Sequence, residues 1–388
     1  MITKKIAHMN DIIIQKSREF IENNKQTLDD IKSNIFPLTG HPISLKDISY
    51  DINSIDILIL TATPDETNIV RTKIKKPEYV NKGARLYTVG KMGLYNVVHV
   101  ESAAGSGEID ASEDTTIAAI DIWEPKMIIS VGIAYGINID KHNLGDVVFA
   151  AQAITYSGAK ISDSQIVLSK NLWIPSPDSY LKRLIKVFSQ FEHGFSLHSG
   201  SIITGENVID DDNFKNKLVE AVKALRPVGG EMESYGIYKA AHKKKIQYCF
   251  MLKGICDWGT GKNSIPKEQQ KDVQLLAANN ATSVVFHLLS NALYFEEIGL
   301  LTTENYYTLL DISDQFVQHQ DLVDAIKHVK EIYNHYKELY KLYSNEFLDE
   351  LVKYGYCDKN FDLTDKGILL LFSLPEFDPY VRYRKKAK

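Results

Sequence analysis

Three acidic segments carry the side chains in this sequence that are best suited to acid–base chemistry. TATPDET contains Asp65 and Glu66, GGEMES contains Glu231 and Glu233, and KGICDWG contains Asp257. Buried carboxylates cost free energy unless they are paired or bound to something. In an α/β sheet, ligands bind beyond the carboxyl ends of the strands, so we expect the three segments to converge on one pocket.

Each acid also has a structural interpretation when it is considered alone. Asp65 or Glu66 could cap a helix expected over TNIVRTKIKK, because acidic side chains suit a helix N-terminus. Asp257 could be a turn residue. Glu231 and Glu233 would not share a face on a formed helix, but they would point the same way from an extended segment. Glu231 could also cap the helix that comes after it.

The elements that must position these acids alternate between apolar strands and helices. This pattern indicates an α/β domain whose sheet is covered on both faces, and we expect it over residues 51–297. The expected strands cover residues 55–63, 84–90, 95–102, 127–137, 145–154 and 246–257, and the expected helices cover residues 115–125, 179–191 and 236–244.

The two ends of the chain differ from this domain. Apolar residues recur at helical spacing from about residue 3 to residue 35, which predicts a helical N-terminal extension within residues 1–50. A helical C-terminal domain is expected over residues 298–388, where tyrosines step by three and four residues along one helix. Residues 347–372 resemble the end of a winged helix. We expect this region to pack or to bind a partner, with DNA binding as the alternative.

The composition is that of an ordinary soluble protein. Of 388 residues, 44% are hydrophobic and 24% are charged, and the formal net charge is -5. This balance gives no general attraction to nucleic acid or to an anionic membrane, and no apolar run is long enough to span a bilayer. Three cysteines without CxxC spacing, and no recognisable signal peptide, favour a cytoplasmic protein. We therefore expect neither a membrane nor a nucleic-acid partner.

Motifs for other common chemistries are missing from the sequence. It has no GxSxG, no GxGxxG after the first strand and no GxxxxGK[ST], and its histidines and cysteines do not follow metal-ligand spacing. We therefore expect no metal and no other cofactor. The chemistry that remains is acid–base chemistry by carboxylates.

Several segments taken together resemble the nucleoside phosphorylase and nucleosidase superfamily. They are ILILTATPDETNIV, VGIAYGI with LGDVV, SGSIITGENVID, GGEMESYGIYKAA and KGICDWG, in this order over about residues 55–295. The resemblance is closest to the 5′-methylthioadenosine/S-adenosylhomocysteine nucleosidase branch. It implies an α/β fold with a mixed central sheet flanked by helices, a homo-oligomer, and an enzyme that cleaves the N-glycosidic bond between a purine and ribose.

The resemblance also implies a role for individual residues in that cleavage, whose transition state resembles an oxocarbenium ion. Asp257 would protonate the departing purine, so it would have to hold a proton near neutral pH, and Glu66 would activate a water molecule. Glu233 would accept hydrogen bonds from both ribose hydroxyls. Met232 would pack on the sugar, and Glu231 would line the ribose side.

Three further residues are implied to contact the base. Asn207 and Val208 fall where the family uses a segment whose backbone meets the purine edge and whose side chain packs on its face. Ala134 lies in the loop after its strand, where backbone groups approach the ligand. Tyr156 could stack on the base or belong to the core.

The same comparison favours hydrolysis over phosphorolysis. Phosphorylases of the superfamily bind phosphate through arginines in the first loop and after the VGxxxG strand, and this sequence has none at either place. Arg71 and Arg85 are the nearby residues that could reverse this interpretation. A phosphate-dependent purine nucleoside phosphorylase and a nucleotide sensor with a non-catalytic pocket stay open as alternatives.

Departures from the branch leave the substrate open between a nucleoside and a nucleotide. Cys256 stands where the family often has serine, and the segment after Asp257 is longer and more basic than in the housekeeping enzymes. It resembles an effector module found with other domains in bacterial defence systems. Arg71, Lys253 and Lys262 are candidate ligands for nucleotide phosphates. Methylthioadenosine, adenosine, AMP and ATP all stay open as substrates.

Overall fold

The computed structural model describes most of the N-terminal three quarters of the chain. The described residues are 2–34, 55–161, 166–167, 173–177 and 194–290, without positions 94 and 108, together with a few positions between 352 and 364. Two compact units comprise Met1–Lys91 with Asn96–Phe286, and Met92–Tyr95 with His287–Lys388. The helix predicted at residues 179–191 and the predicted tyrosine-rich helix lie outside the described residues.

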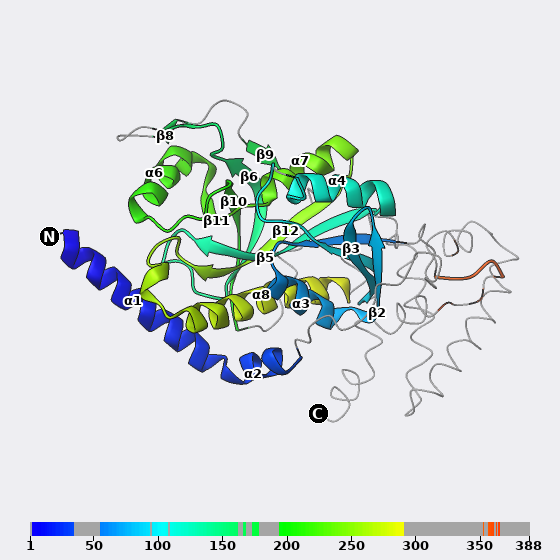
Figure 1. Cartoon of the computed structure of the whole chain (residues 1–388), viewed down its shortest axis with the longest axis horizontal. Helices are drawn as coiled ribbons and strands as arrows, with labels where there is room; N and C mark the ends of the chain where they lie inside the picture. Colours follow the sequence, from blue (N-terminus) through cyan, green and yellow to red (C-terminus); the bar gives the residue numbers. More distant parts are fainter. Residues whose placement is uncertain are drawn as a thin grey trace, which may run out of the picture. The chain divides into compact units, whose positions relative to one another are not determined.

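A mixed sheet forms the centre of the larger unit (Figure 1). Its strands are β1 (Ile57–Thr61), β2 (Lys75–Lys82), β3 (Arg85–Met92), β4 (Tyr95–Glu101), β5 (Met127–Gly136), β6 (Val147–Thr155), β9 (Trp173–Pro175), β10 (Leu197–Thr204), β11 (Pro227–Glu231) and β12 (Tyr248–Asp257). The order is β11-β10-β6-β12-β5-β1-β4-β3-β2, with β9 beside β6. Two short strands, β7 (Lys160–Ile161) and β8 (Ile166–Val167), pair with each other.

The direction of the central strands brings several strand ends to one place. β5 runs parallel to both β1 and β12, so these three strands end at the same edge of the sheet. β11 pairs in parallel with β10 and antiparallel with the end of β5. One end of the sheet therefore closes on itself, and the end of β11 lies beside the end of β5.

Helices cover both faces of the sheet, as the alternating pattern predicts (Figure 1). They are α1 (Ile2–Asn23), α2 (Lys25–Asn34), α3 (Pro64–Lys73), α4 (Ser112–Trp123), α6 (Asp212–Val222), α7 (Ser234–Lys244) and α8 (Lys267–Leu289), with short 3-10 turns η3 (Lys223–Leu225) and η4 (Lys262–Ser264). α3 and α8 lie on one face, and α4 and α7 pack together on the other. Among the described helices, none is long and apolar enough to cross a membrane.

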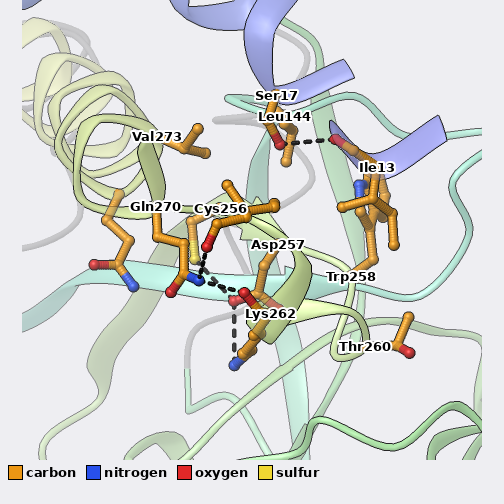
Figure 2. A pocket seen from close by; sticks show the side chains of 12 residues that line it. Ile13, Ser17, Leu144, Cys256, Asp257, Trp258, Thr260, Lys262, Gln270 and Val273 are labelled. Atoms are coloured by element: carbon orange, nitrogen blue, oxygen red, sulfur yellow. Dashed lines mark hydrogen bonds and ion pairs between the residues drawn. The ribbon is translucent and has the colours of Figure 1, made fainter. Parts of the chain in front are cut away.

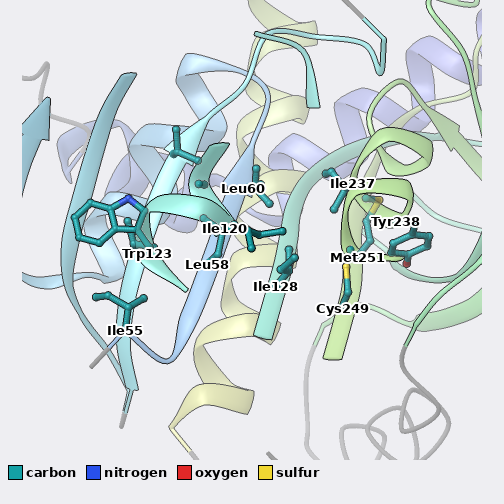
Figure 3. Packing of buried hydrophobic residues seen from close by; sticks show 14 of the residues in the cluster. Ile55, Leu58, Leu60, Ile120, Trp123, Ile128, Ile237, Tyr238, Cys249 and Met251 are labelled. Atoms are coloured by element: carbon teal, nitrogen blue, oxygen red, sulfur yellow. The ribbon is translucent and has the colours of Figure 1, made fainter. Parts of the chain in front are cut away.

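The core beneath α4 and α7 holds the sheet in place (Figure 3). Every residue of β1 is buried, as expected for a strand covered on both faces. From α4, the Trp123 ring meets the Tyr87 ring edge-on, with centroids 5.4 Å apart. The Tyr238 hydroxyl of α7 donates a hydrogen bond to the Ala150 carbonyl at 2.6 Å. These contacts make the strands a firm support for the loops at their ends.

The predicted N-terminal helix is interrupted once. α1 ends at Asn23 and α2 begins at Lys25, and the Asn24 side chain donates a hydrogen bond to the Phe20 carbonyl at this break. Leu28 and Ile31 of α2 are buried in a cluster with apolar residues of α8. The helical extension thus packs on the larger unit.

The segment after α3 differs from the prediction. A helix through TNIVRTKIKK is wrong at its end, because α3 stops at Lys73 and Lys75–Lys82 form β2. Pro77 contributes to the change, since a proline disfavours helical geometry at the residue before it and cannot donate the backbone hydrogen bond that a longer helix would need. The strands β9, β10 and β11 were also absent from the expected set, because each is short or rich in glycine and serine.

Candidate active site

A pocket of about 280 Å³ lies at the shared edge where β1, β5, β11 and β12 end. Glu66, Glu231, Glu233 and Asp257 all line it, so the three acidic segments do converge. Its size is close to the lower end of the range for small-molecule sites, roughly 300–1,000 Å³. The pocket therefore brings four carboxylates into a space suited to one small ligand.

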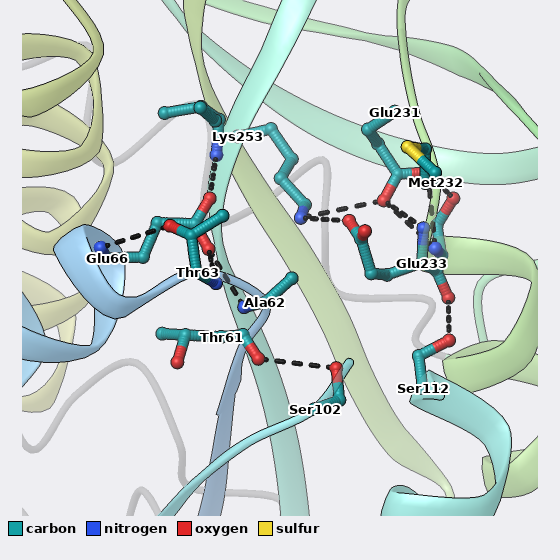
Figure 4. A network of polar contacts seen from close by, with 12 residues as sticks. Thr61, Ala62, Thr63, Glu66, Ser102, Ser112, Glu231, Met232, Glu233 and Lys253 are labelled. Atoms are coloured by element: carbon teal, nitrogen blue, oxygen red, sulfur yellow. Dashed lines mark hydrogen bonds and ion pairs between the residues drawn. The ribbon is translucent and has the colours of Figure 1, made fainter. Parts of the chain in front are cut away.

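Glu66 is held at the start of α3 by the backbone around it (Figure 4). Thr63 and Glu66 form a capping box, and Glu66 Oε2 accepts hydrogen bonds from the Ala62 and Thr63 amides at 2.8 and 3.0 Å. Its Oε1 accepts a third from the Ile133 amide of β5 at 2.8 Å. Gly132 leaves the necessary room, because a Cβ there would lie 2.4 Å from Oε1.

Burial tunes the charge of Glu66. The side chain is only 3% exposed, and its burial raises the pKa of Glu66 above the ordinary value. The Lys253 ammonium opposes this rise, and the Glu233 carboxylate adds to it. A carboxylate with a raised pKa is a stronger base near neutral pH than an exposed glutamate.

Glu231 and Glu233 are separated by one residue and share a buried lysine (Figure 4). Lys253 Nζ lies 3.1 Å from Glu233 Oε2 and 3.5 Å from Glu231 Oε2. Glu231 ends β11, and its carboxylate accepts bonds from the Glu233 and Ser234 amides and from the Ser234 hydroxyl. Glu231 thus caps α7, whereas Glu233 turns its carboxylate toward the pocket and Lys253.

Lys253 stays charged although it is 1% exposed. Burial alone would lower the pKa of Lys253, but the carboxylates of Glu233, Glu231 and Glu66 outweigh burial and raise it. Sequence reasoning named Lys253 as a phosphate ligand, whereas the structure places it beneath the two glutamates and not among the described residues that line the pocket. The signal for this pairing was a lone lysine inside an apolar strand, which needs a buried counter-charge.

A glycine-containing loop completes the environment of Glu233. The Gly105 amide donates to Glu233 Oε1 at 3.4 Å, and the Ser106 hydroxyl donates to the Met232 carbonyl at 2.7 Å. Glu206 holds the same loop from the other side by accepting a bond from the Ser106 amide at 3.1 Å. Sequence reasoning did not identify Gly105, Ser106 or Glu206. Glu206 follows β10 in the segment SGSIITGENVID, but nothing in the sequence shows that it would meet the loop at Ser106.

Asp257 lies at the end of β12 with three donors around it. Its Oδ1 accepts a hydrogen bond from the Gly259 amide at 2.7 Å, and Oδ2 lies 3.4 Å from Cys256 Sγ and 3.3 Å from Lys262 Nζ. Burial, reinforced by Asp257, raises the pKa of the Cys256 thiol well above its ordinary value, so the thiol remains an S–H donor. Cys256 can therefore replace a serine beside this acid.

A smaller cavity of about 20 Å³ lies behind Asp257 (Figure 2). Its walls include Ile13 and Ser17 of α1 together with Cys256 and Lys262. The volume suffices for about one water molecule. Helix α1, which precedes the predicted catalytic domain, therefore borders the loop that carries Asp257.

The residues predicted to meet the base also line the larger pocket. Ala134 lies within β5 and not in a loop after that strand, so the prediction of its local structure was wrong, although it does line the pocket. Asn207 and Val208 follow β10. Tyr156 does not line the pocket; its hydroxyl donates to the Asn207 carbonyl at 2.9 Å and so supports that segment. Tyr135, which sequence reasoning missed, lines the pocket as well, and Gly230 makes room for its ring. In the sequence, the only feature that could have indicated Tyr135 as a pocket residue is its place in AYG at the end of a strand.

The remaining predicted phosphate ligands differ in their placement. Lys262 lines the pocket, whereas Arg71 does not and instead donates from Nε to Thr88 Oγ1 at 2.9 Å. Arg85 pairs with Asp110 and Asp114 at 2.6 and 2.5 Å. Met232, predicted to pack on a sugar, lines the pocket beside the two glutamates. Among the described residues, no cluster of three or more His, Cys, Asp or Glu side chains could hold a metal ion.

This chain belongs to the phosphorylase superfamily, because the model of that family matches residues 56–290. The resemblance read from the sequence is thus confirmed. The family match covers the mixed sheet and every acid that lines the pocket. It leaves α1 and α2 outside, although α1 borders the smaller cavity.

Similar proteins point to nucleosidases within this superfamily. A "Death domain-containing ATP nucleosidase" of Amphimedon queenslandica is 28% identical over 277 residues, which are 63% of this chain and 50% of that protein. The chain thus matches half the length of that relative. A 5′-methylthioadenosine/S-adenosylhomocysteine nucleosidase of Bacillus thuringiensis (strain Al Hakam) is 22% identical over 227 residues, covering 58% of this chain and 95% of that protein.

Solved structures share the fold. A 5′-methylthioadenosine/S-adenosylhomocysteine nucleosidase of Neisseria meningitidis, in complex with methylthio-immucillin-A, superposes with a TM-score of 0.52 at 16% identity, covering 61% of this chain and 98% of that one. The futalosine hydrolase of Helicobacter pylori strain 26695 superposes with a TM-score of 0.51 at 18% identity, covering 60% of this chain and 96% of that one. The predicted fold class, a mixed central sheet flanked by helices, is therefore confirmed for the described domain.

Proposed function

We propose that this protein is a purine N-glycosidase, which hydrolyses the bond between a purine and ribose and releases the free base. The observation that carries the proposal is the convergence of Glu66, Glu233 and Asp257 on one pocket in a chain of the phosphorylase superfamily. The nucleosidases among its relatives support the same reaction. Each acid has one task in that reaction.

Asp257 acts as the general acid that protonates the departing base. Its position at a strand end, beside the buried Trp258, places the carboxyl at the wall where Ala134 and Val208 would contact a purine. A purine leaves poorly as an anion, so a positioned acid lowers the barrier. Cys256 and the Gly259 amide orient the carboxyl for this transfer.

Glu233 accepts hydrogen bonds from the two ribose hydroxyls. Lys253 and the Gly105 amide each hold one oxygen of its carboxylate, so its orientation is set before a substrate arrives. A charged acceptor forms stronger hydrogen bonds than a neutral one. The negative carboxylate also favours the positive charge that develops on the sugar. Met232 packs against the sugar beside it.

Glu66 activates the attacking water molecule. Three backbone amides hold its carboxylate, and burial raises its pKa, which makes it a better base. A carboxylate in the first loop also disfavours a phosphate ion at that place. Arg71 and Arg85 are engaged elsewhere, which supports hydrolysis over phosphorolysis.

The test is release of free base by wild-type protein and by Asp257→Asn. Chromatography would follow adenine, hypoxanthine and guanine from the corresponding nucleosides and nucleotides, including methylthioadenosine and ATP. We expect wild type to release base and Asp257→Asn to be slower by about 10²–10⁴-fold while still binding ligand. Equal release by the two proteins would overturn the assignment of the acid.

The proposal extends to the setting of the reaction. We infer a cytoplasmic homo-oligomer that depletes a purine nucleotide in bacterial antiviral defence. Of these points, the similarity to an ATP nucleosidase supports the nucleotide substrate. Light scattering would test the homo-oligomer, since a monomeric mass at working concentration would contradict it.

A further inference from the structure

Lys262 gives the pocket a feature that the proposed reaction does not use. Among the described residues that line the pocket, it is the one with a cationic side chain. Its Nζ lies 3.3 Å from Asp257 Oδ2, so the ammonium pairs with the proposed general acid (Figure 2). Two further ammonium groups lie nearby and have partners of their own. Lys253 is paired with two glutamates, and Lys215 is paired with Asp212 and donates to the Trp258 carbonyl.

The backbone of Lys262 is anchored, whereas its side chain can change partner. The Lys262 amide donates to Asp210 Oδ1 at 2.9 Å, and its carbonyl accepts a bond from the Gln270 side chain. Gly261, with φ of 71°, turns the chain immediately before it. The ammonium lies at the end of a flexible four-carbon stem whose side chain is 26% exposed. It can therefore swing while its base stays fixed.

The pair with Asp257 works against the proposed chemistry. An adjacent ammonium stabilises a negative carboxylate, but the departing base needs a carboxyl that gives up a proton. Lys262 does not lose its charge to resolve this conflict. Burial would lower the pKa of Lys262, but Asp257, followed by Cys256 and Asp210, outweighs burial and raises it. Only another anion could draw the ammonium away from Asp257.

We propose that a phosphate group of a purine nucleotide replaces Asp257 as the ion-pair partner of the Lys262 ammonium. This exchange of partners binds the phosphate and also separates the proposed general acid, Asp257, from the ammonium. This inference rests on the proposed N-glycosidase function and names its substrate class. With a nucleotide, Lys262 gains a doubly charged partner. Asp257, no longer beside the ammonium, takes up a proton from solvent and can deliver it to the base. With an uncharged nucleoside, Lys262 stays on Asp257 and slows the step.

The charge of the pocket supports a phosphate as the exchanging anion. Four carboxylates line the wall, and a nucleotide would be repelled there without a compensating cation. Lys262 supplies that cation at the edge of the site. For a nucleoside substrate the same ammonium would meet no phosphate and would stay paired with Asp257 Oδ2.

The test compares AMP with adenosine for wild type and Lys262→Met, with kcat and KM measured for each. Wild type should prefer AMP. The substitution should lower kcat/KM for AMP by about 10–100-fold, the worth of a charge-assisted contact, and raise kcat for adenosine. Lys262→Arg should keep the preference for AMP. Lys271→Met removes an equal charge from an exposed lysine outside the pocket, and it should leave kcat and KM unchanged for both substrates.

The outcomes separate this inference from the proposed function. The exchange would be overturned, and the N-glycosidase function left intact, if wild type released base with equal kcat/KM from AMP and adenosine. The same holds if Lys262→Met lowered kcat/KM equally for both substrates. No base from AMP or adenosine, while another purine nucleoside releases base, would overturn the exchange alone. No base from any purine nucleoside or nucleotide would overturn both. Calorimetry gives a second test. Asp257→Asn should bind AMP more tightly than wild type does, and it should bind adenosine with the same affinity as wild type. An affinity for AMP that does not increase in Asp257→Asn would also overturn the exchange. So would an increase that persists in the double variant with Lys262→Met.

Discussion

Glu233 and Lys253 form an ion pair, 3.1 Å from Oε2 to Nζ, in which both side chains are almost wholly buried. The lysine comes from the middle of β12 and the glutamate from the start of α7, so the pair joins the sheet to the pocket wall. Lys253 also lies 3.5 Å from Glu231. One buried cation thus compensates two carboxylates, and both of these glutamates line the pocket.

Lys253→Met should destabilise the protein, because it leaves two buried carboxylates without a counter-charge. Breaking a buried pair by removing one partner costs about 3–5 kcal/mol in the free energy of unfolding. Denaturant titration would measure it. The matched control is Lys239→Met, which removes a 40% exposed partner of Glu113 and should cost less than about 1 kcal/mol. Similar small losses for both variants would contradict the role of Lys253.

Glu233→Gln should lose the grip on ribose, because an amide offers one acceptor oxygen and no charge. We expect kcat/KM to fall by at least about 100-fold, since bonds to charged acceptors are each worth roughly 1.5–3 kcal/mol. A nucleoside without 2′- and 3′-hydroxyls gives the control. Wild type should cleave this nucleoside with a low kcat/KM, and Glu233→Gln should lower that kcat/KM little further. A full additional loss would mean that Glu233 acts elsewhere.

The pH dependence of turnover should report on Glu66. Its folded-state pKa is raised above 4.5, first by burial. As the pH falls through this raised pKa, Glu66 takes up a proton and can no longer accept one from water. We therefore expect the acid limb of kcat/KM to lie above pH 4.5. A pH–rate profile that stays flat down to pH 4.5 would contradict Glu66 as the base.

Gly132→Ala should disturb catalysis through Glu66 alone. A Cβ at this position would lie 2.4 Å from Oε1 and 2.7 Å from the carboxyl carbon, so the side chain must move. Misplacing a catalytic group by about 1 Å costs up to roughly 100-fold in rate. Gly194→Ala, whose Cβ would meet nothing within 4 Å, is the control and should leave kcat unchanged. Unchanged kcat in Gly132→Ala would remove the need for this glycine.

Strand ends made much of the site predictable from the sequence. Glu66 and Asp257 each come after an apolar run, and the residues that succeed parallel strands meet at one edge of a sheet. Glu231 and Glu233 were predicted from an extended segment before a helix, and the structure shows β11 ending at Glu231. The pairing order of the strands was not readable, because the residues of β11 give no sign that it would meet both β10 and β5.

Long-range pairing accounts for the parts of the site that the sequence did not show. The charge of Lys253 is visible in the sequence, but its pairing with Glu233, 20 residues away along the chain, is not, so the prediction of a phosphate ligand was wrong. Gly105, Ser106 and Glu206 reach the site only through the loops between strands. The end of α3 is not marked by the lysines around it, because lysine occurs in helices and strands alike, and Pro77 is the one local signal against a longer helix.

The most direct measurement is base release from AMP and adenosine in phosphate-free buffer and in buffer with inorganic phosphate, with the sugar product identified by mass spectrometry. Hydrolysis predicts free base at equal rates in both buffers, with ribose or ribose 5-phosphate as the other product and water as the source of its new oxygen. Base that forms only when phosphate is present, with a sugar 1-phosphate as the other product, would contradict the account.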